Sequence, residues 1–175
     1  MRITVLTLAV LLAGTAHAQF AHRSFGGGVS FVKFTGGSAT TGLDFAIPVA
    51  LEGSLYIENG FDVYLQVPLM IVRVKAGGPR SDGTGEVFGT GGHLGVRYLF
   101  LQETIRPYAG LELAGVVLLT NPTVIFAGPG ASAGIDWFVA DTISLGARGF
   151  FDLFLELNAP LRPSFGGGLS FAAYF

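Results

Sequence analysis

The sequence predicts an all-β fold, specifically an eight-stranded antiparallel up-and-down transmembrane β-barrel. Three observations carry this prediction: apolar and polar residues alternate along most of the chain, the alternating segments are long, and few residues are charged. The 175 residues include 27 Gly and 16 Phe, and 13% are charged, whereas an ordinary soluble domain has about 25% charged residues. Mean hydropathy is +0.59, which excludes a disordered chain. A net charge of −2 excludes a basic nucleic-acid binder, and the absence of cysteine excludes a disulfide framework.

The first element of the chain is a predicted signal peptide over residues 1–18. Met1 and Arg2 form a short positive start, residues 3–13 are apolar, and residues 16–18 (Ala-His-Ala) form a small-x-small cleavage site. The apolar run is shorter than the roughly 20 residues that a membrane-spanning helix needs. We therefore expect export from the bacterial cytoplasm and one outer-membrane β-barrel domain over residues 19–175.

Eight alternating segments follow the signal peptide. Residues 43–57 carry apolar side chains at odd positions, Asn59-Gly60 suits a hairpin turn with φ > 0, and the odd positions 61–71 are apolar again. Most segments exceed the five or six residues of an average soluble strand and reach the roughly 9–11 that a tilted membrane strand needs. The predicted strands are residues 25–34, 43–57, 61–74, 87–100, 106–119, 125–138, 143–154 and 164–175.

The connections between these strands alternate between short and long, with the fifth as the weakest case. Short periplasmic turns and longer outer loops are typical of bacterial outer-membrane barrels. An even number of strands also returns both chain ends to the periplasmic side. The sequence therefore predicts location in the bacterial outer membrane, with outer-membrane lipids around the apolar face.

Aromatic residues gather near the predicted strand ends, where two aromatic girdles are expected at the membrane interfaces. Each group belongs to one level of the barrel. The first group is Phe25, Phe61, Phe100, Trp137 and Phe175, and the second is Phe45, Phe88, Phe126 and Phe165.

The other face of the strands is small or polar and is expected to line the lumen. An eight-stranded barrel is only just wide enough for side chains, and a buried charge needs a partner. The sequence supplies partners at two heights, one near the periplasmic end and one near mid-height. We expect these residues to form ion-pair clusters that plug the lumen: Asp62, Arg97 and Asp136 at the first height, His93, Glu112 and Arg148 at the second, and Asp152 on the same face.

The closing segment, residues 164–175 with the sequence SFGGGLSFAAYF, resembles the terminal strand of the small eight-stranded outer-membrane β-barrel proteins, like the transmembrane barrel of OmpA-type proteins. Residues 106–113 (RPYAGLEL) resemble a barrel strand common in that group. The resemblance implies that the barrel-assembly machinery reads Phe171, Tyr174 and Phe175 during biogenesis. We expect a monomer surrounded by lipid, with no nucleic-acid partner and no peptidoglycan-binding domain after the barrel, so the resemblance does not imply the anchoring role of full-length OmpA-type proteins.

The sequence predicts no catalytic, cofactor or metal site. The segment Gly130-Ala131-Ser132-Ala133-Gly134 matches the G-x-S-x-G motif of esterases, but that motif needs a sharp strand-to-helix turn. Here it lies within an alternating strand, so we expect a small-residue stretch of the barrel interior. The three histidines His17, His22 and His93 do not form a pattern of metal ligands.

The sequence therefore predicts a structural function, in envelope integrity or at the cell surface, without enzyme activity. A lipid-handling protein or lipid-modifying enzyme, a narrow pore, and a soluble barrel with an apolar interior remain as alternatives. Three prolines, Pro48, Pro68 and Pro129, fall inside predicted strands, where each removes a ladder hydrogen bond. We expect β-bulges there; a weakened seam at Pro48 and Pro68 that admits lipid is the functional alternative.

Overall fold

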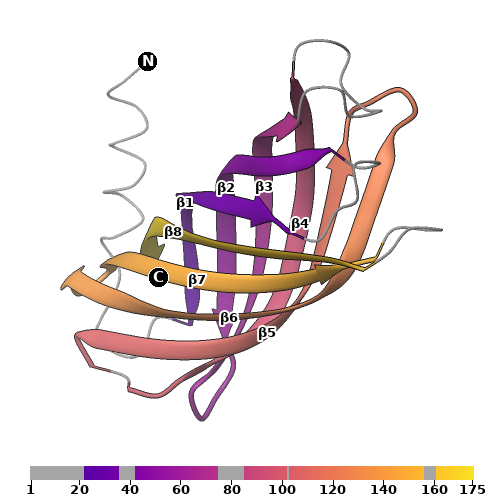
Figure 1. The fold of residues 1–175 in the computed structure, drawn as a ribbon. Helices are drawn as coiled ribbons and strands as arrows, with labels where there is room; N and C mark the ends of the chain where they lie inside the picture. Colours follow the sequence, from indigo (N-terminus) through magenta and orange to yellow (C-terminus); the bar gives the residue numbers. More distant parts are fainter. Residues whose placement is uncertain (1–21, 36–41, 75–84, 102, 156–160) are drawn as a thin grey trace, which may run out of the picture.

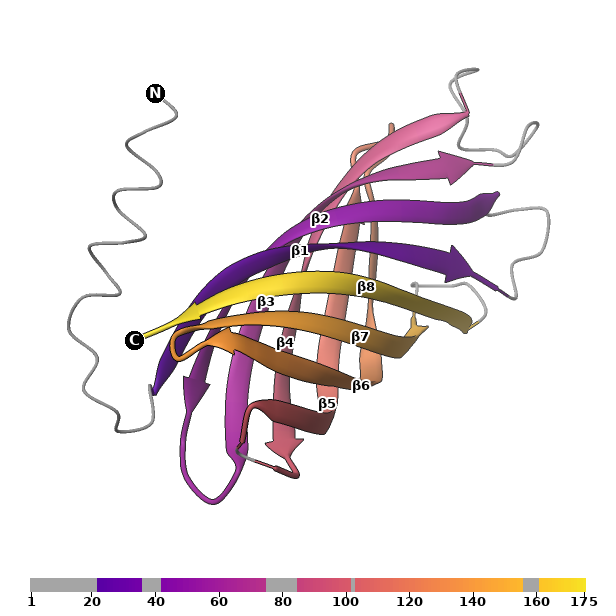
Figure 2. The ribbon, with the colours of Figure 1, turned by 90° about the vertical axis from the view of Figure 1, so that its left-hand side faces the viewer.

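The computed structural model describes residues 22–35, 42–74, 85–101, 103–155 and 161–175, and these form one closed eight-stranded β-barrel (Figures 1 and 2). Every strand pairs antiparallel with the next one, and β1 pairs with β8 to close the barrel. The predicted fold is confirmed, and each predicted strand boundary lies within two residues of the observed one. The predicted signal peptide lies outside the described residues. The strands are β1 (Arg23–Phe34), β2 (Leu43–Tyr56), β3 (Phe61–Val74), β4 (Glu86–Leu99), β5 (Ile105–Leu118), β6 (Val124–Ala140), β7 (Ile143–Phe154) and β8 (Arg162–Tyr174).

The two ends of the barrel differ in their connections. At one end, here called the turn end, β2 joins β3 through the predicted Asn-Gly hairpin, in which Asn59 has φ 54° and Gly60 has φ 88°. The start of β1 and the end of β8 lie at this same end, where Arg23 and Phe175 exchange two backbone hydrogen bonds of 3.2 and 2.9 Å. The opposite end, here called the loop end, holds the connections after β1, β3, β5 and β7.

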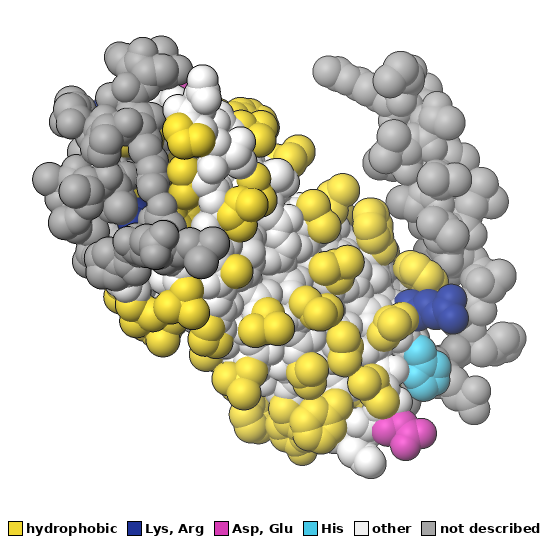
Figure 3. Space-filling view, turned by 90° about the vertical axis from the view of Figure 1, so that its right-hand side faces the viewer, with side chains coloured by type: hydrophobic (Ala, Val, Ile, Leu, Met, Phe, Trp, Pro, Cys, Tyr) yellow, Lys and Arg dark blue, Asp and Glu magenta, His cyan; other side chains and the backbone are white. Residues whose placement is uncertain are grey.

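Apolar side chains cover the outside of the barrel (Figure 3). In the view of Figure 3 they spread over the middle of the surface, and the few charged side chains and the histidine drawn there lie toward its ends. The first predicted aromatic group points outward, with exposed fractions between 46% and 57%. Among the described residues, no helix is long and apolar enough to cross a membrane.

Two residues that the sequence analysis places outside, Leu43 through the alternation and Phe126 through its aromatic group, lie inside instead. Leu43 turns inward because the β2–β3 register shifts between Leu43 and Phe45. Phe126, predicted for the second aromatic group, is only 1% exposed and packs in the lumen against Phe154, with ring centroids 6.4 Å apart. Both corrections occur near the loop end, where side chains on both faces of the strands are apolar.

The lumen has an apolar half and a polar half, whereas the sequence predicts a small or polar lining throughout. The apolar half lies at the loop end and is filled by side chains from all strands except β8. Its large members include Phe34, Met70, Leu118, Phe126 and Phe154. The charged residues of the two predicted groups lie between this apolar packing and the turn end, whereas the buried Arg162 lies at the loop end, 4.9 Å from the ring centroid of Phe126. Only part of the lumen therefore carries the predicted network.

The prolines do not form the expected β-bulges. Pro48 interrupts the β1–β2 ladder, Pro68 the β3–β4 ladder and Pro129 the β6–β7 ladder, and the register is the same on both sides of each gap. Proline lacks a donor on only one side of its strand, so the other ladder is kept. The β2–β3 pairing runs unbroken past Pro48 and Pro68, and a weakened seam between these two strands is therefore not found.

Candidate functional site: the charged lumen

Arg97 on β4 is the centre of the first group of charges, near the turn end. Its Nε donates to Asp62 Oδ2 at 2.7 Å, and its Nη1 donates to Glu52 Oε1 at 3.1 Å. Asp62 is the direct cross-strand partner of Arg97, whereas Glu52 reaches it from β2. The guanidinium therefore bridges two carboxylates, the geometry for which its planar fork is suited. We call Glu52, Asp62 and Arg97 the turn-end cluster.

Glu112 on β5 is the centre of the second group, near mid-height. Its Oε2 accepts hydrogen bonds from Arg148 Nη2 and from the Tyr64 hydroxyl. Arg148 also donates to the Tyr64 hydroxyl at 3.1 Å and to Gln66 Oε1 at 3.3 Å. The Glu112 side chain is fully buried, so Arg148 supplies the compensating charge that burial requires.

His93 on β4 and Asp152 on β7 complete this second group. His93 Nδ1 lies 3.5 Å from Glu112 Oε1. Asp152 is 1% exposed and accepts a hydrogen bond of 3.5 Å from the Ser164 hydroxyl at its Oδ2. We call His93, Glu112, Arg148 and Asp152 the mid-lumen cluster.

Aromatic rings separate and support the two clusters. The Arg97 guanidinium lies 5.3 Å from the ring centroid of Tyr64 and 5.0 Å from that of Tyr108. The Arg148 guanidinium lies 5.2 Å from the same Tyr64 ring centroid. These distances fall within the range of cation–π attraction, so Tyr64 links both arginines.

Glycines opposite the long side chains leave the room that the network occupies. A Cβ at Gly95 would come within 2.6 Å of the Tyr64 ring, and one at Gly134 within 2.5 Å of the Tyr108 hydroxyl. A Cβ at Gly130 would come within 2.1 Å of Asp152 Oδ1. The glycine-rich face that the sequence shows therefore corresponds to contact positions in the lumen.

The structure brings together most, but not all, of the residues that the sequence selects. Asp136 lines a cavity with Arg97 and Asp62 and is buried. Within the described residues, however, the ion pairs of Arg97 are with Asp62 and Glu52. Asp136 therefore belongs to the wall of the turn-end cluster rather than to its ion pairs.

Sequence analysis misses three members of the network: Glu52, Tyr64 and Gln66. All three occupy even positions on strands whose odd positions are apolar. The period-two pattern that selects Asp62 therefore also points to them, and the neutral Tyr64 and Gln66 are missed when only charges are paired.

Ser132, in the esterase-like motif, lies in the middle of β6. It pairs with Gly110 on β5 and with Phe150 on β7, and it is 6% exposed. Its hydroxyl lies 3.4 Å from the Tyr64 hydroxyl. Because the backbone here is a doubly paired strand, Ser132 does not occupy the exposed turn that a nucleophilic serine of this motif needs.

The three residues of the C-terminal segment differ in orientation. Phe171 and Phe175 point outward, with exposed fractions of 59% and 46%. Tyr174 is half-buried, and its ring lies 4.8 Å from that of Phe138. The segment therefore offers two aromatic side chains to the outside of the barrel.

No protein-family model matches the chain, and no curated protein matches it. The fold is similar to that of Neisserial surface protein A, with a TM-score of 0.66 and 13% identity over 90% of this chain and 99% of that chain. It is similar to the outer membrane protein OprG from Pseudomonas aeruginosa, with a TM-score of 0.62 and 13% identity over 90% and 97% of the two chains. The fold is also similar to the N-terminal β-barrel domain of OprF from the same organism, with a TM-score of 0.56 and 13% identity over 88% of this chain and 99% of that chain. At these identities the likeness concerns the fold, and the chain has the fold of the small eight-stranded outer-membrane β-barrel proteins.

Proposed function

We propose that the chain is a monomeric, integral barrel of the bacterial outer membrane with a structural or surface role in the envelope and no catalysis. Its outer face contacts lipid, the barrel-assembly machinery inserts it, and its lumen is closed by the two charge clusters. Nucleic acid is not a partner.

The observation that carries the proposal is the inverted polarity of the barrel. Large apolar side chains such as Leu111, Leu113 and Leu169 are 65% to 73% exposed. Charged side chains such as Asp62, Arg97 and Glu112 are at most 6% exposed. Soluble monomers rarely expose a contiguous apolar surface of more than a few hundred Å². The apolar outer face therefore supports contact with the hydrocarbon of a membrane. Strands of 12 to 17 residues are long enough to cross it.

A paired gel tests the membrane part of the proposal. Protein extracted in detergent is run with and without boiling, and a mobility shift on boiling is expected for a closed membrane barrel. Solubility in plain buffer together with the absence of a shift would overturn the proposal in favour of a soluble barrel.

A narrow pore is the second candidate, because a cavity of about 40 Å³ runs along the inner walls of β1 and β8. Its lining includes Gly26, Gly28, Glu52, Arg97 and Arg148, so it touches both clusters. The volume exceeds the roughly 10–15 Å³ that one water needs, but charged side chains of both clusters line the cavity, and we propose that they close it to ions. In planar lipid bilayers we expect no steady conductance steps; regular steps would replace the closed barrel with the pore.

Lipid modification receives no comparable support. Ser132 is buried in a doubly paired strand, and the expected seam between β2 and β3 is fully paired. Activity on labelled lipid A that disappears in Ser132→Ala would overturn the proposal of a barrel without catalysis.

A further inference from the structure

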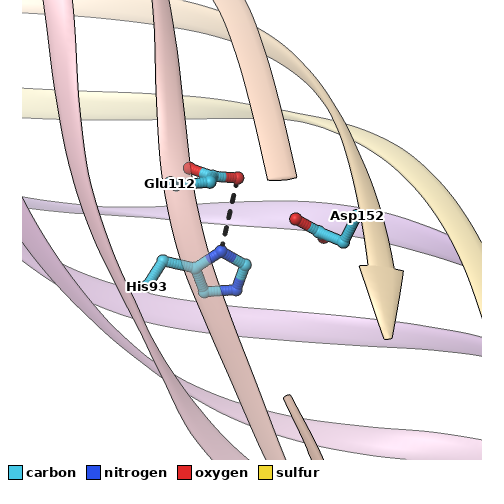
Figure 4. Close-up of side chains that lie close together, drawn as sticks. All are labelled: His93, Glu112 and Asp152. Atoms are coloured by element: carbon cyan, nitrogen blue, oxygen red, sulfur yellow. Dashed lines mark ion pairs between the residues drawn. The ribbon is translucent and has the colours of Figure 1, made fainter. Parts of the chain in front are cut away.

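The mid-lumen cluster contains three polar atoms that point into one space and have no hydrogen-bond partner. They are His93 Nδ1, Glu112 Oε1 and Asp152 Oδ1. The three residues are 8%, 4% and 1% exposed, and one ligand atom from each lies within 4.8 Å of the others. Figure 4 shows the three side chains converging from β4, β5 and β7.

Each carboxylate uses its other oxygen for anchoring. Glu112 Oε2 is held by Arg148 and Tyr64, and Asp152 Oδ2 by Ser164. Outer hydrogen bonds of this kind orient the ligands of metal sites and leave the ligating oxygen free. Burying three polar atoms without hydrogen-bond partners is costly, and a cation between them would satisfy all three.

From this arrangement we propose that His93, Glu112 and Asp152 form a binding site for one divalent transition-metal ion, with Zn²⁺ as the best-fitting example. An imidazole ligand favours Zn²⁺ and its transition-metal neighbours, whereas Ca²⁺ and Mg²⁺ prefer oxygen ligands throughout. The proposal concerns an internal site and goes beyond the structural role proposed above.

The distance between two of the three ligand atoms fits a common metal centre. With metal bonds of about 2.0–2.1 Å, two ligands of a tetrahedral ion lie about 3.3 Å apart. His93 Nδ1 and Glu112 Oε1 are 3.5 Å apart, close to that spacing and too far for a well-formed hydrogen bond. The ligand atom of Asp152 lies within 4.8 Å of those of the other two residues, so Asp152 moves closer when the ion binds.

Water can supply the fourth ligand. His93 and Asp152 line a cavity of about 20 Å³ that also touches Gln66 and Phe150. This volume holds a water molecule, which needs about 10–15 Å³. The ion would join β4, β5 and β7 inside the barrel, at the boundary between the apolar half and the turn-end cluster.

The site can be tested with Zn²⁺ on the detergent-extracted barrel carrying a histidine-free affinity tag. We expect about one Zn²⁺ per chain by metal analysis, and an unfolding temperature that rises with added Zn²⁺ and returns with a chelator. His93→Ala and the isosteric Asp152→Asn are expected to weaken Zn²⁺ binding by more than about tenfold. His22→Ala is the matched control, because His22 is exposed at the turn end, and it is expected to bind like the wild type.

Three outcomes would overturn the proposal. One is a wild-type chain that neither retains nor responds to Zn²⁺. Another is Zn²⁺ binding that survives in His93→Ala or disappears in His22→Ala. The third is a barrel whose unfolding temperature changes with pH in the wild type but not in Asp152→Asn, and does not change with Zn²⁺. That result would identify the three side chains as a cluster held together by shared protons. Because Asp152→Asn retains the size of the side chain, a folded variant is available even if His93→Ala fails to fold.

Discussion

Arg148 on β7 and Glu112 on β5 form an ion pair although β6 lies between their strands. On β6 the positions paired with them are both glycine: Gly134 opposite Arg148 and Gly130 opposite Glu112. The two side chains therefore meet over a strand that presents no side chain at either position. The ion pair therefore connects β5 and β7, two strands that share no backbone hydrogen bonds.

Reversing this charge tests how much the pair contributes. In Arg148→Glu, Glu112 loses its guanidinium and faces a second carboxylate in a buried site. Removing one partner of a buried pair costs about 3–5 kcal/mol, so the free energy of unfolding is expected to fall by about that amount. Urea unfolding in lipid vesicles, followed by the fluorescence of Trp137, the only tryptophan of the chain, measures it. An unchanged unfolding curve would remove Arg148 from the plug.

The glycine at position 130 gives a second prediction. In Gly130→Ala the new Cβ would lie 2.1 Å from Asp152 Oδ1 and 3.0 Å from Glu112 Cγ. Asp152 must then turn away, and we expect a loss of about 1–3 kcal/mol in stability, as for other overpacked interiors. Gly149→Ala is the matched control, since its nearest atom would be 3.9 Å away and the position is exposed. The same unfolding measurement compares them, and equal losses would show that the space at Gly130 is not required.

The period-two pattern predicts the barrel well because strand direction and face are local properties of the sequence. It predicts the lumen less well where both faces are apolar. Near the loop end Met70 and Val72 point inward while Leu69 and Ile71 point outward, and the residue types alone do not distinguish the two faces. Phe126 is misplaced because its aromatic group assigns it to the outside, whereas the alternation along β6 puts it on the lumen face with Gly128 and Gly130. The contacts within the clusters depend on the height of each residue across non-neighbouring strands, which a single sequence does not specify. His93 is therefore predicted as a lumen residue, whereas its convergence with Asp152 is seen only in three dimensions.

Placing a charge on the outer face tests the solvent around the barrel. Leu111 lies in the middle of β5 and is 73% exposed. If lipid surrounds it, Leu111→Arg costs about 2–4 kcal/mol, as at the centre of a bilayer. Ile57, which is 55% exposed beside the hairpin turn, is the control, because Ile57→Arg near the interface costs only about 0–1 kcal/mol.

Unfolding in lipid vesicles distinguishes the two substitutions. On a water-exposed surface both changes would be nearly neutral, within about 0.5 kcal/mol. Equal and small effects would therefore contradict a lipid-facing wall, whatever the state of the lumen.

The C-terminal phenylalanine allows folding and cellular assembly to be separated. The backbone of Phe175 closes the barrel by its two hydrogen bonds with Arg23, and Phe175→Ala preserves both of them. Its side chain points outward and is 46% exposed, so removing it leaves the lumen clusters intact. If the assembly machinery reads this side chain, the amount of barrel in the outer membrane of cells is expected to fall severalfold. Refolding of the same variant from urea into detergent is expected to proceed as in the wild type.

Phe165→Ala is the control, because Phe165 is also outward-facing on β8, with 51% exposure, but lies near the loop end. A parallel loss of refolding and assembly in Phe175→Ala would instead assign its ring to barrel closure, since a defect present without the machinery cannot arise from recognition by it.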